Sequence, residues 1–92
     1  MQKIYWTEKA NNDLLRLYEF LLQVNPKAAI NVVNKLTTAP DILLEHCRIG
    51  EQLFEYEPRE VRKLLVGKYE MHYEIQNDNI IILCIWHAKE NR

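Results

Sequence analysis

The first half of the chain repeats its apolar residues at the spacing of a helix. Between residues 8 and 24 they recur at i, i+4, i+7, i+8 and i+11, which share one helical face: Ala10, Leu14, Leu17, Tyr18 and Leu21. Thr7 is a favourable N-cap residue, and the carboxylate of Glu8 suits the positive end of a helix dipole. The pattern therefore predicts an amphipathic helix that begins just after Thr7.

A second helix follows with almost no linker. Asn25 is a good N-cap, and Pro26 is tolerated at the first helical position because no amide donor is needed there. The apolar face of this helix is predicted to contain Ala29, Ile30, Val33 and Leu36. Pro40 ends or kinks the helix, since proline lacks the backbone N–H and clashes with the preceding turn. The tight joint predicts an antiparallel helical hairpin.

After Gly50 the hydrophobic period changes from that of a helix to that of a strand. The segments QLFEY, EVRKLLV, YEMHYEI and IIILCIW are rich in β-branched and aromatic residues and alternate with a period of two. Gly67 and Lys68 fit a two-residue type II′ hairpin turn with glycine first, and residues 76–79 form a second turn. Loops this short make neighbouring strands antiparallel.

The alternation along residues 69–75 indicates which face of the sheet is covered. One face is predicted to meet the helices and carries Tyr69, Met71, Tyr73 and Ile75. The other is predicted to face water or a ligand and carries Glu70, His72 and Glu74. A short strand at residues 2–6 is expected to join the sheet. We therefore expect a single domain over residues 1–92, of the α+β class, with an N-terminal helical hairpin packed on one face of a small antiparallel β-sheet.

Composition narrows the functional classes. The 92 residues are 48% hydrophobic and 27% charged, which is typical of one globular core. The net charge of −1 gives no general attraction to nucleic acid, although it leaves room for a local basic patch. The apolar runs are too short to span a bilayer, and the first twelve residues lack the apolar segment of a signal peptide. We expect a cytoplasmic protein in which Cys47 and Cys84 are reduced.

Cationic residues concentrate in the second half of the chain. If the last strands are neighbours, the open face of the sheet gathers cations near one end: Arg59, Arg62, Lys63, His87, Lys89 and Arg92. Such a cluster suits phosphates or carboxylates, and His87 is of the residue type that most often serves as a catalytic acid or base. The alternative is a solvated charged surface, because Glu70, Glu74 and Glu90 dilute the cluster. Charge pattern alone favours the solvated surface.

The sequence gives little support to a metal or cofactor site. Cys84 and His87 are metal-ligand types, but residues three apart on a strand point to opposite faces. The chain has only two cysteines and three histidines, which are few candidate ligands for a four-ligand zinc site. A glycine-rich phosphate loop is missing as well. We therefore expect neither a metal nor a cofactor.

Three segments resemble the ParE/RelE superfamily of toxins from bacterial type II toxin–antitoxin systems: YWTEKANNDLLRLYEFL, VRKLLVGKYEMHYEI and IIILCIWHAKENR. The resemblance covers nearly the whole chain in order. Its specific parts are the first-helix motif, the spacing along the strands and the final segment, represented by Trp6, Thr7, Ala10, Asp13 and Leu14, by Arg62, Tyr69 and Tyr73, and by His87 and Arg92. The fold implied by the resemblance is the one that periodicity predicts.

The superfamily divides by mechanism, and this chain resembles the ParE-like branch more closely. RelE-like members cleave messenger RNA in the ribosome with basic residues on the sheet and usually a tyrosine near the C-terminus. Here Glu70 follows Tyr69, where those proteins carry arginine, and the residues after His87 include no tyrosine. The mildly acidic chain is also poorly suited to ribosomal RNA, because phosphate attraction dominates such binding.

The resemblance implies a toxin that binds DNA gyrase, stabilises its cleaved complex with DNA and needs no covalent chemistry of its own. Position and charge suggest the target-contacting residues Arg59, Arg62, His87, Lys89 and Arg92. One alternative is a ribosome-dependent endoribonuclease that uses Arg62, His87 and Arg92. Another is a non-toxic relic that only binds antitoxins. A cognate antitoxin is implied in a hetero-oligomeric complex, with a segment over the helices and sheet edge that covers an apolar groove.

Overall fold

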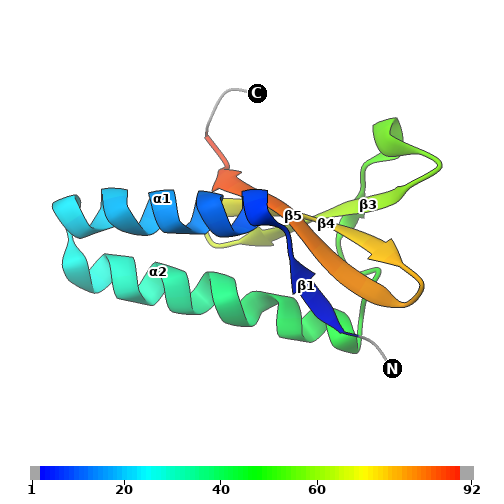
Figure 1. Ribbon diagram of the computed structural model, residues 1–92, viewed down its shortest axis with the longest axis horizontal. Coiled ribbons are helices and arrows are strands. Elements are labelled where there is room, and N and C mark those ends of the chain that lie inside the picture. Colours follow the sequence, from blue (N-terminus) through cyan, green and yellow to red (C-terminus); the bar gives the residue numbers. More distant parts are fainter. Residues whose placement is uncertain (1–2, 90–92) are drawn as a thin grey trace.

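The computed structural model describes residues 3–89. Its elements are β1 (Ile4–Trp6), α1 (Glu8–Val24), α2 (Pro26–Thr38), the 3₁₀ helix η1 (Ala39–Leu44), β2 (Glu51–Gln52), the 3₁₀ helix η2 (Phe54–Tyr56), β3 (Glu60–Val66), β4 (Tyr69–Gln76) and β5 (Asn79–His87). α1 and α2 form a hairpin whose tip extends beyond the strands (Figure 1). Among these residues, no helix is long and apolar enough to cross a membrane.

Both long helices begin at the predicted caps. The backbone N–H of Ala10 donates to Thr7 Oγ1 at 3.1 Å, and that of Ala28 donates to Asn25 Oδ1 at 3.2 Å. These bonds satisfy amide donors that the first turn of a helix cannot pair internally. The local sequence signals therefore set where each helix begins.

The second helix differs from prediction in its buried stripe and its end. Ala29 and Leu36 are fully buried, whereas Ile30 is 54% exposed, so its assignment to the apolar face was wrong. Each residue advances about 100° around a helix, which turns Ile30 away from the stripe that Ala29 begins. The α-helix ends at Thr38, and the chain continues through Pro40 as a 3₁₀ helix.

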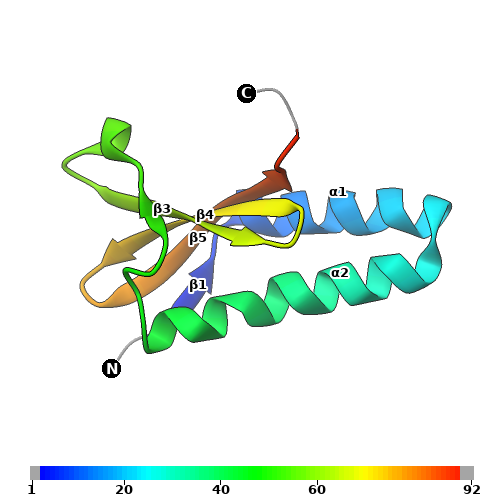
Figure 2. The same ribbon diagram turned by 180° about the vertical axis from the view of Figure 1, so that it is seen from behind.

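The described strands form one sheet in the order β1-β5-β4-β3-β2. The β2–β3, β3–β4 and β4–β5 pairs are antiparallel, as predicted. The strand predicted at QLFEY was wrong beyond Gln52, because Phe54–Tyr56 forms the 3₁₀ helix η2. The predicted N-terminal strand joins the sheet but runs parallel to β5, with Ile4 opposite Ile80 and Trp6 opposite Ile82. Seen from behind, the β3–β4 hairpin passes in front of the start of α1 (Figure 2).

Both strand turns follow their sequence signals. Gly67 has φ +60° while Lys68 stays outside the positive-φ region, as in a type II′ turn. Asn77 and Asp78 have φ +48° and +67°, the pair of left-handed residues that a type I′ turn needs. These two-residue turns fix the register of β3, β4 and β5.

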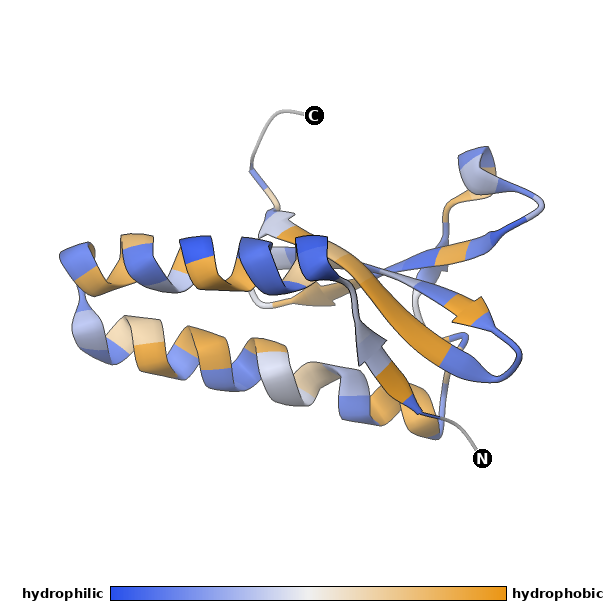
Figure 3. Cartoon of the chain, in the orientation of Figure 1, coloured by the Kyte–Doolittle hydropathy of each residue, from blue (hydrophilic) through white to orange (hydrophobic). Residues whose placement is uncertain are grey.

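The core lies between the helices and the sheet. Met71 and Tyr73 are fully buried there, as predicted, together with Ile80 and Ile82 of β5. His72 pairs with Cys84 and Tyr73 with Ile82, so Leu83 forms a bulge. The extra residue lets Ile82 and Ile85 both face the helices despite their odd spacing. Figure 3 shows β5 as a largely hydrophobic strand, whereas the two helices have mixed hydropathy.

The opposite face of the sheet is less open than predicted. This face was predicted to meet water or a ligand, but His72 is only 8% exposed and Glu74 only 4% exposed, so the water-facing alternative was wrong for both. Leu53 N donates to Val61 O at 2.8 Å, which ties the chain entering η2 to β3. Arg59, just after η2, binds Glu74. This non-local cover explains the burial.

Candidate functional site

The start of α1 is fastened to β5 by backbone and side-chain hydrogen bonds. Thr7 N donates to Ile82 O at 3.0 Å, and Thr7 Oγ1 lies 3.0 Å from the carbonyl oxygens of both Ile82 and Leu83. Ala10 is fully buried in the core, where a larger side chain would separate the helix from the strand. This part of the first-helix motif is therefore an α1–β5 joint.

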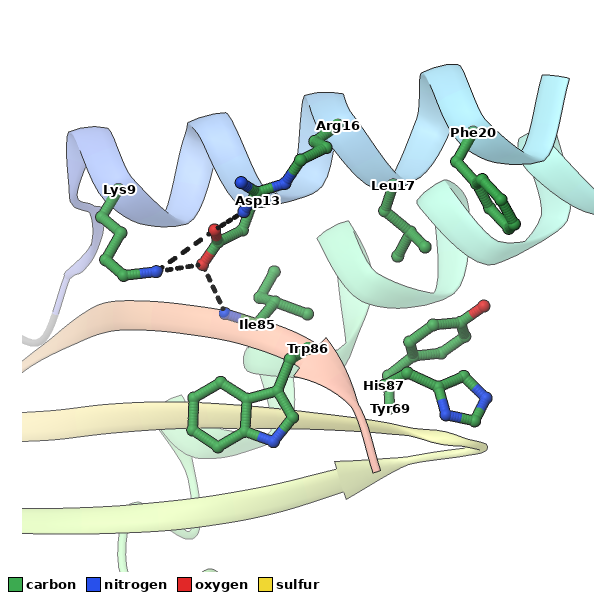
Figure 4. A pocket seen from close by; sticks show the side chains of 9 residues that line it. All are labelled: Lys9, Asp13, Arg16, Leu17, Phe20, Tyr69, Ile85, Trp86 and His87. Atoms are coloured by element: carbon green, nitrogen blue, oxygen red, sulfur yellow. Dashed lines mark hydrogen bonds and ion pairs between the residues drawn. The ribbon is translucent and has the colours of Figure 1, made fainter. Parts of the chain in front are cut away.

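Asp13 extends the same joint by one helical turn. Its side chain is 3% exposed, and Oδ2 accepts a hydrogen bond from Ile85 N at 3.1 Å (Figure 4). Lys9 Nζ lies 3.1 Å from the same oxygen, and Arg16 pairs with the other oxygen. The two cations and the amide compensate the cost of burying a carboxylate.

A groove of about 730 Å³ opens beside this joint. Figure 4 shows Leu17 and Phe20 reaching down from α1 toward Tyr69 and His87 at the end of the sheet. Phe20 is 61% exposed, so the groove has an apolar lip beside the Asp13 ion pairs. A surface of this kind can bind an amphipathic protein segment.

The end of β5 is held by its neighbouring turn. Ala88 N donates to Lys68 O at 2.8 Å, and the ring of His87 packs edge-on against Tyr69 with centroids 5.3 Å apart. His87 Nδ1 accepts from Lys89 N at 3.1 Å, so a neutral imidazole carries its proton on Nε2. Burial raises the pKa of the Tyr69 phenol. Lys89 is exposed in the turn that follows, and predicted residue Arg92 lies outside the described residues.

The structure divides the predicted cationic cluster between two ends of the sheet. Arg62 lies opposite Tyr73 on β4, whereas His87 lies opposite Tyr69, four residues away. At about 3.3 Å per residue, this separates them by about 13 Å along the strands. Two successive hairpins make β3 and β5 run in the same direction, so the start of one and the end of the other lie apart. The expectation that these cations gather was therefore wrong.

Arg59 and Arg62 both hold the end of the sheet that is remote from His87. Arg62 Nη1 donates to Gly50 O at 2.7 Å and to Arg48 O at 3.3 Å, and its side chain is only 15% exposed. Burial acts to raise the pKa of Glu60, but hydrogen bonds from Arg48 and Arg62 outweigh it and hold that pKa below its usual value. These arginines are tied to loops and carboxylates of the chain itself.

Hydrogen bonding also keeps Glu74 charged. The hydrogen bonds from Arg59, with a further one from Gln76, lower the pKa of the buried Glu74 carboxyl against the opposing effect of burial. The Arg59 side chain remains 52% exposed, so the charged pair keeps one hydrated partner.

A second pocket, of about 580 Å³, lies on the face of the sheet away from the core. His72 Nε2 lies 3.1 Å from Glu70 Oε2, and the rings of His72 and Trp86 are 4.2 Å apart in edge-to-face geometry. Lys63, across the strands from His72, contacts Glu51 at 3.8 Å. Cations and carboxylates therefore alternate here without forming a basic surface. Within residues 3–89, no group of three or more His, Cys, Asp or Glu side chains is arranged to hold a metal ion.

The sequence model for the ParE toxin of type II toxin–antitoxin systems (parDE) matches residues 4–92. This chain belongs to the ParE toxin family. A solved structure described as a chromosomal ParDE TA system from P. aeruginosa has a similar fold, with a TM-score of 0.78 and 23% sequence identity. The similarity covers 95% of this chain and 96% of the other. Among curated proteins, no sequence matches.

In this ParE family member, sequence reasoning missed the role of Asp13 and its two cations. A carboxylate one residue before Leu14, on a stripe otherwise apolar, was a visible signal for a buried ion pair. Its partner Ile85 lies 72 residues away, so the strand contact itself left no local trace. The pocket at His72 was missed because burial of that face depends on the folded path of the chain around η2.

Proposed function

We propose that this protein inhibits growth by binding DNA gyrase and stabilising its cleaved complex with DNA. The observation that carries the proposal is the ParE family match along residues 4–92. Binding between two proteins requires a shaped surface and no catalytic group in the toxin. The alternating charges around Glu70, His72 and Lys63 agree with this role better than with phosphate-directed RNA binding, which needs net positive charge.

The separation of Arg62 from His87 counts against the ribonuclease alternative. General acid–base catalysis requires the participating groups to lie within hydrogen-bond reach of one substrate. These residues lie about 13 Å apart along the strands, at about 3.3 Å per residue, and Arg62 is engaged by Gly50 and Arg48. The pair is therefore poorly placed to act together on one bond of a substrate.

The target surface proposed here is centred on the end of β5. His87 lies at the mouth of the α1 groove, Lys89 is exposed beside it, and Arg92 follows in the sequence. Arg59 is half-exposed and offers a cation at the remote end. Arg62 contributes by holding the loop at Gly50, so its replacement acts first on that loop.

A cognate antitoxin is proposed to cover the apolar side chains of the helical hairpin in a hetero-oligomeric complex. Phe20 and Val24, one turn apart on α1, are 61% and 68% exposed, and Ile30 of α2 is 54% exposed. Large apolar side chains in such numbers mark a surface that a partner covers. An amphipathic antitoxin segment would place its own apolar side chains against them.

The decisive experiment mixes the purified chain with gyrase and plasmid DNA and follows supercoiling and trapped DNA breaks. The proposal expects loss of supercoiling, accumulation of cleaved DNA and reversal of both effects by the antitoxin. Pulse labelling after induction in cells provides the second measurement: DNA synthesis should stop while translation continues. An early stop in translation would instead indicate a ribosome-directed nuclease, and normal growth would indicate a relic.

A further inference from the structure

Half of β5 has no strand neighbour on its outer edge within the described residues. β1 pairs with β5 only from Ile80 to Ile82, and Thr7 then leads the chain into α1. Beyond that point Asp13 takes over, because its carboxylate accepts the outward N–H of Ile85 at 3.1 Å. One side chain thus supplies the acceptor that a longer β1 would otherwise provide.

We propose that Asp13 is a positioning residue that holds the end of β5, including His87 and Lys89, in the geometry required to bind the target. The inference rests on the proposed function and adds to it a residue that need not touch gyrase. Asp13 acts through Ile85, because its carboxylate accepts the hydrogen bond from the outward N–H of that residue. His87 follows two residues later and therefore points to the same face as Ile85.

The segment after Ile85 is held from both sides. Asp13 fixes the outer edge of β5, and Lys68 O accepts from Ala88 N at 2.8 Å on the inner edge. Without the outer bond, the strand end hinges on the β4 side alone. His87 would then lose its fixed position against Tyr69, and Lys89, which donates to His87 Nδ1, would move with it.

The hydrogen-bond acceptor and the negative charge of Asp13 have separate roles. Lys9 and Arg16 have side chains 62% and 75% exposed, so they neutralise the carboxylate while remaining hydrated. The bond to Ile85 needs only an acceptor oxygen, which asparagine also has. Asp13→Asn should therefore preserve positioning, whereas Asp13→Ala should abolish it. A role through charge alone would make both variants equally defective.

Tyr73→Phe provides a matched control for general loss of stability. Tyr73 is fully buried, donates to Cys47 O at 2.7 Å and accepts from Gly50 N at 3.0 Å. Removing its hydroxyl breaks buried hydrogen bonds four residues along β4 from Tyr69, the partner of His87. All three variants, Asp13→Ala, Asp13→Asn and Tyr73→Phe, are compared with wild type at a temperature at which circular dichroism shows each to be folded.

The experiment measures three quantities for each protein: hydrogen exchange of the Ile85 and Ala88 amides by NMR, the concentration that half-inhibits gyrase supercoiling, and growth arrest after induction. Asp13→Ala should speed exchange at Ile85 by about tenfold or more and raise the half-inhibitory concentration similarly, the scale of one buried charge-assisted hydrogen bond. Asp13→Asn should stay within about threefold of wild type. Tyr73→Phe should leave Ile85 exchange and inhibition near wild type.

Equal loss of inhibition in Asp13→Ala and Tyr73→Phe would overturn the proposal, since Asp13 would then act through stability alone. Unchanged Ile85 exchange in Asp13→Ala would overturn it too. Should the alanine variant not fold, Asp13→Glu replaces it, because the added methylene keeps the charge but displaces the acceptor. If the wild-type protein fails to inhibit gyrase, the proposed function is wrong. The role of Asp13 is then judged from the other two measurements, amide exchange at Ile85 and growth arrest after induction.

Discussion

The guanidinium of Arg59 binds the buried carboxylate of Glu74 through two hydrogen bonds, of 2.7 and 3.2 Å. The pair joins the chain just after η2 to the middle of the sheet. Glu60, at the start of β3, has a similar arrangement with Arg48 and Arg62. One end of the sheet is therefore closed by carboxylates that must remain ionised.

This arrangement predicts a loss of stability in acid. The pKa values of Glu60 and Glu74 both lie below 4.5 in the folded chain, so the unfolded chain binds more protons as the pH falls. The stabilisation is complete above the unfolded pKa and disappears as the pH drops through the folded values. Urea unfolding from pH 7 to pH 3 checks this, and Glu74→Gln should flatten the dependence. An unchanged pH slope in that variant would contradict the assignment.

Gly50→Ala should destabilise the fold through a steric clash. A Cβ at this position would lie 2.6 Å from Lys63 O and 2.7 Å from the Tyr73 hydroxyl, too close for any real Cβ. We expect a loss of about 1–3 kcal/mol in the free energy of unfolding, measured by urea denaturation.

Gly67→Ala is the matched control for Gly50→Ala. A Cβ there meets nothing within 4 Å, but the residue has φ +60°, so the substitution costs backbone strain of about 1–2 kcal/mol without a clash. Gly50→Ala should also disturb the loop that Tyr73 holds, seen as altered NMR shifts at residues 47–50. Shifts confined to Gly50 would show that the loop absorbs the methyl group.

Phe20→Ser should weaken antitoxin binding with little effect on folding. The side chain is 61% exposed beside the α1 groove, so removing it costs the free chain about 0.5 kcal/mol or less. Phe54, 63% exposed on η2 away from that groove, offers a matched control as Phe54→Ser. Titration calorimetry with the cognate antitoxin should show a loss of about tenfold or more for Phe20→Ser only. Equal antitoxin affinities of Phe20→Ser and Phe54→Ser would show that the antitoxin does not bind at Phe20.

Lys89→Glu should reduce gyrase inhibition. The side chain is exposed in the turn after β5, where reversing its charge changes the proposed target surface without touching the core. Lys27→Glu, on an exposed position of α2, makes the same charge change at a distance and should leave inhibition intact. The supercoiling assay compares the two. A similar effect of both substitutions would point to net charge rather than to a contact.

Local signals predicted both long helices and the strands β1, β3, β4 and β5, but not the 3₁₀ helix η2 at Phe54–Tyr56, where a strand was expected. The caps at Thr7 and Asn25 and the turns at Gly67 and Asn77 each depend on a few neighbouring residues, and all formed as expected. Burial of His72 depends instead on contacts from other strands, such as the Trp86 ring 4.2 Å away, which periodicity cannot reveal.

Prediction of the candidate site was limited even more by contacts between residues that are far apart in the sequence. His87 was recognisable as a polar residue at a strand end, but Asp13, 72 residues before its strand partner Ile85, was not recognisable as part of the same site. The separation of Arg62 from His87 was available in principle, because two successive hairpins give β3 and β5 one direction. Counting charges without considering strand direction led to the wrong prediction that Arg62 and His87 lie at the same end of the sheet.

The position of β5 between β1 and β4 has a consequence for synthesis in the cell. β5 is the latest of the five strands to leave the ribosome, yet α1 and β1 find their partners on it. A growing chain that ends before Asn79 has both helices but no strand for Thr7 and Asp13 to bind. Such long-range pairing delays folding until synthesis is nearly complete. Each copy therefore completes the α1–β5 joint and the groove beside it late in synthesis and together.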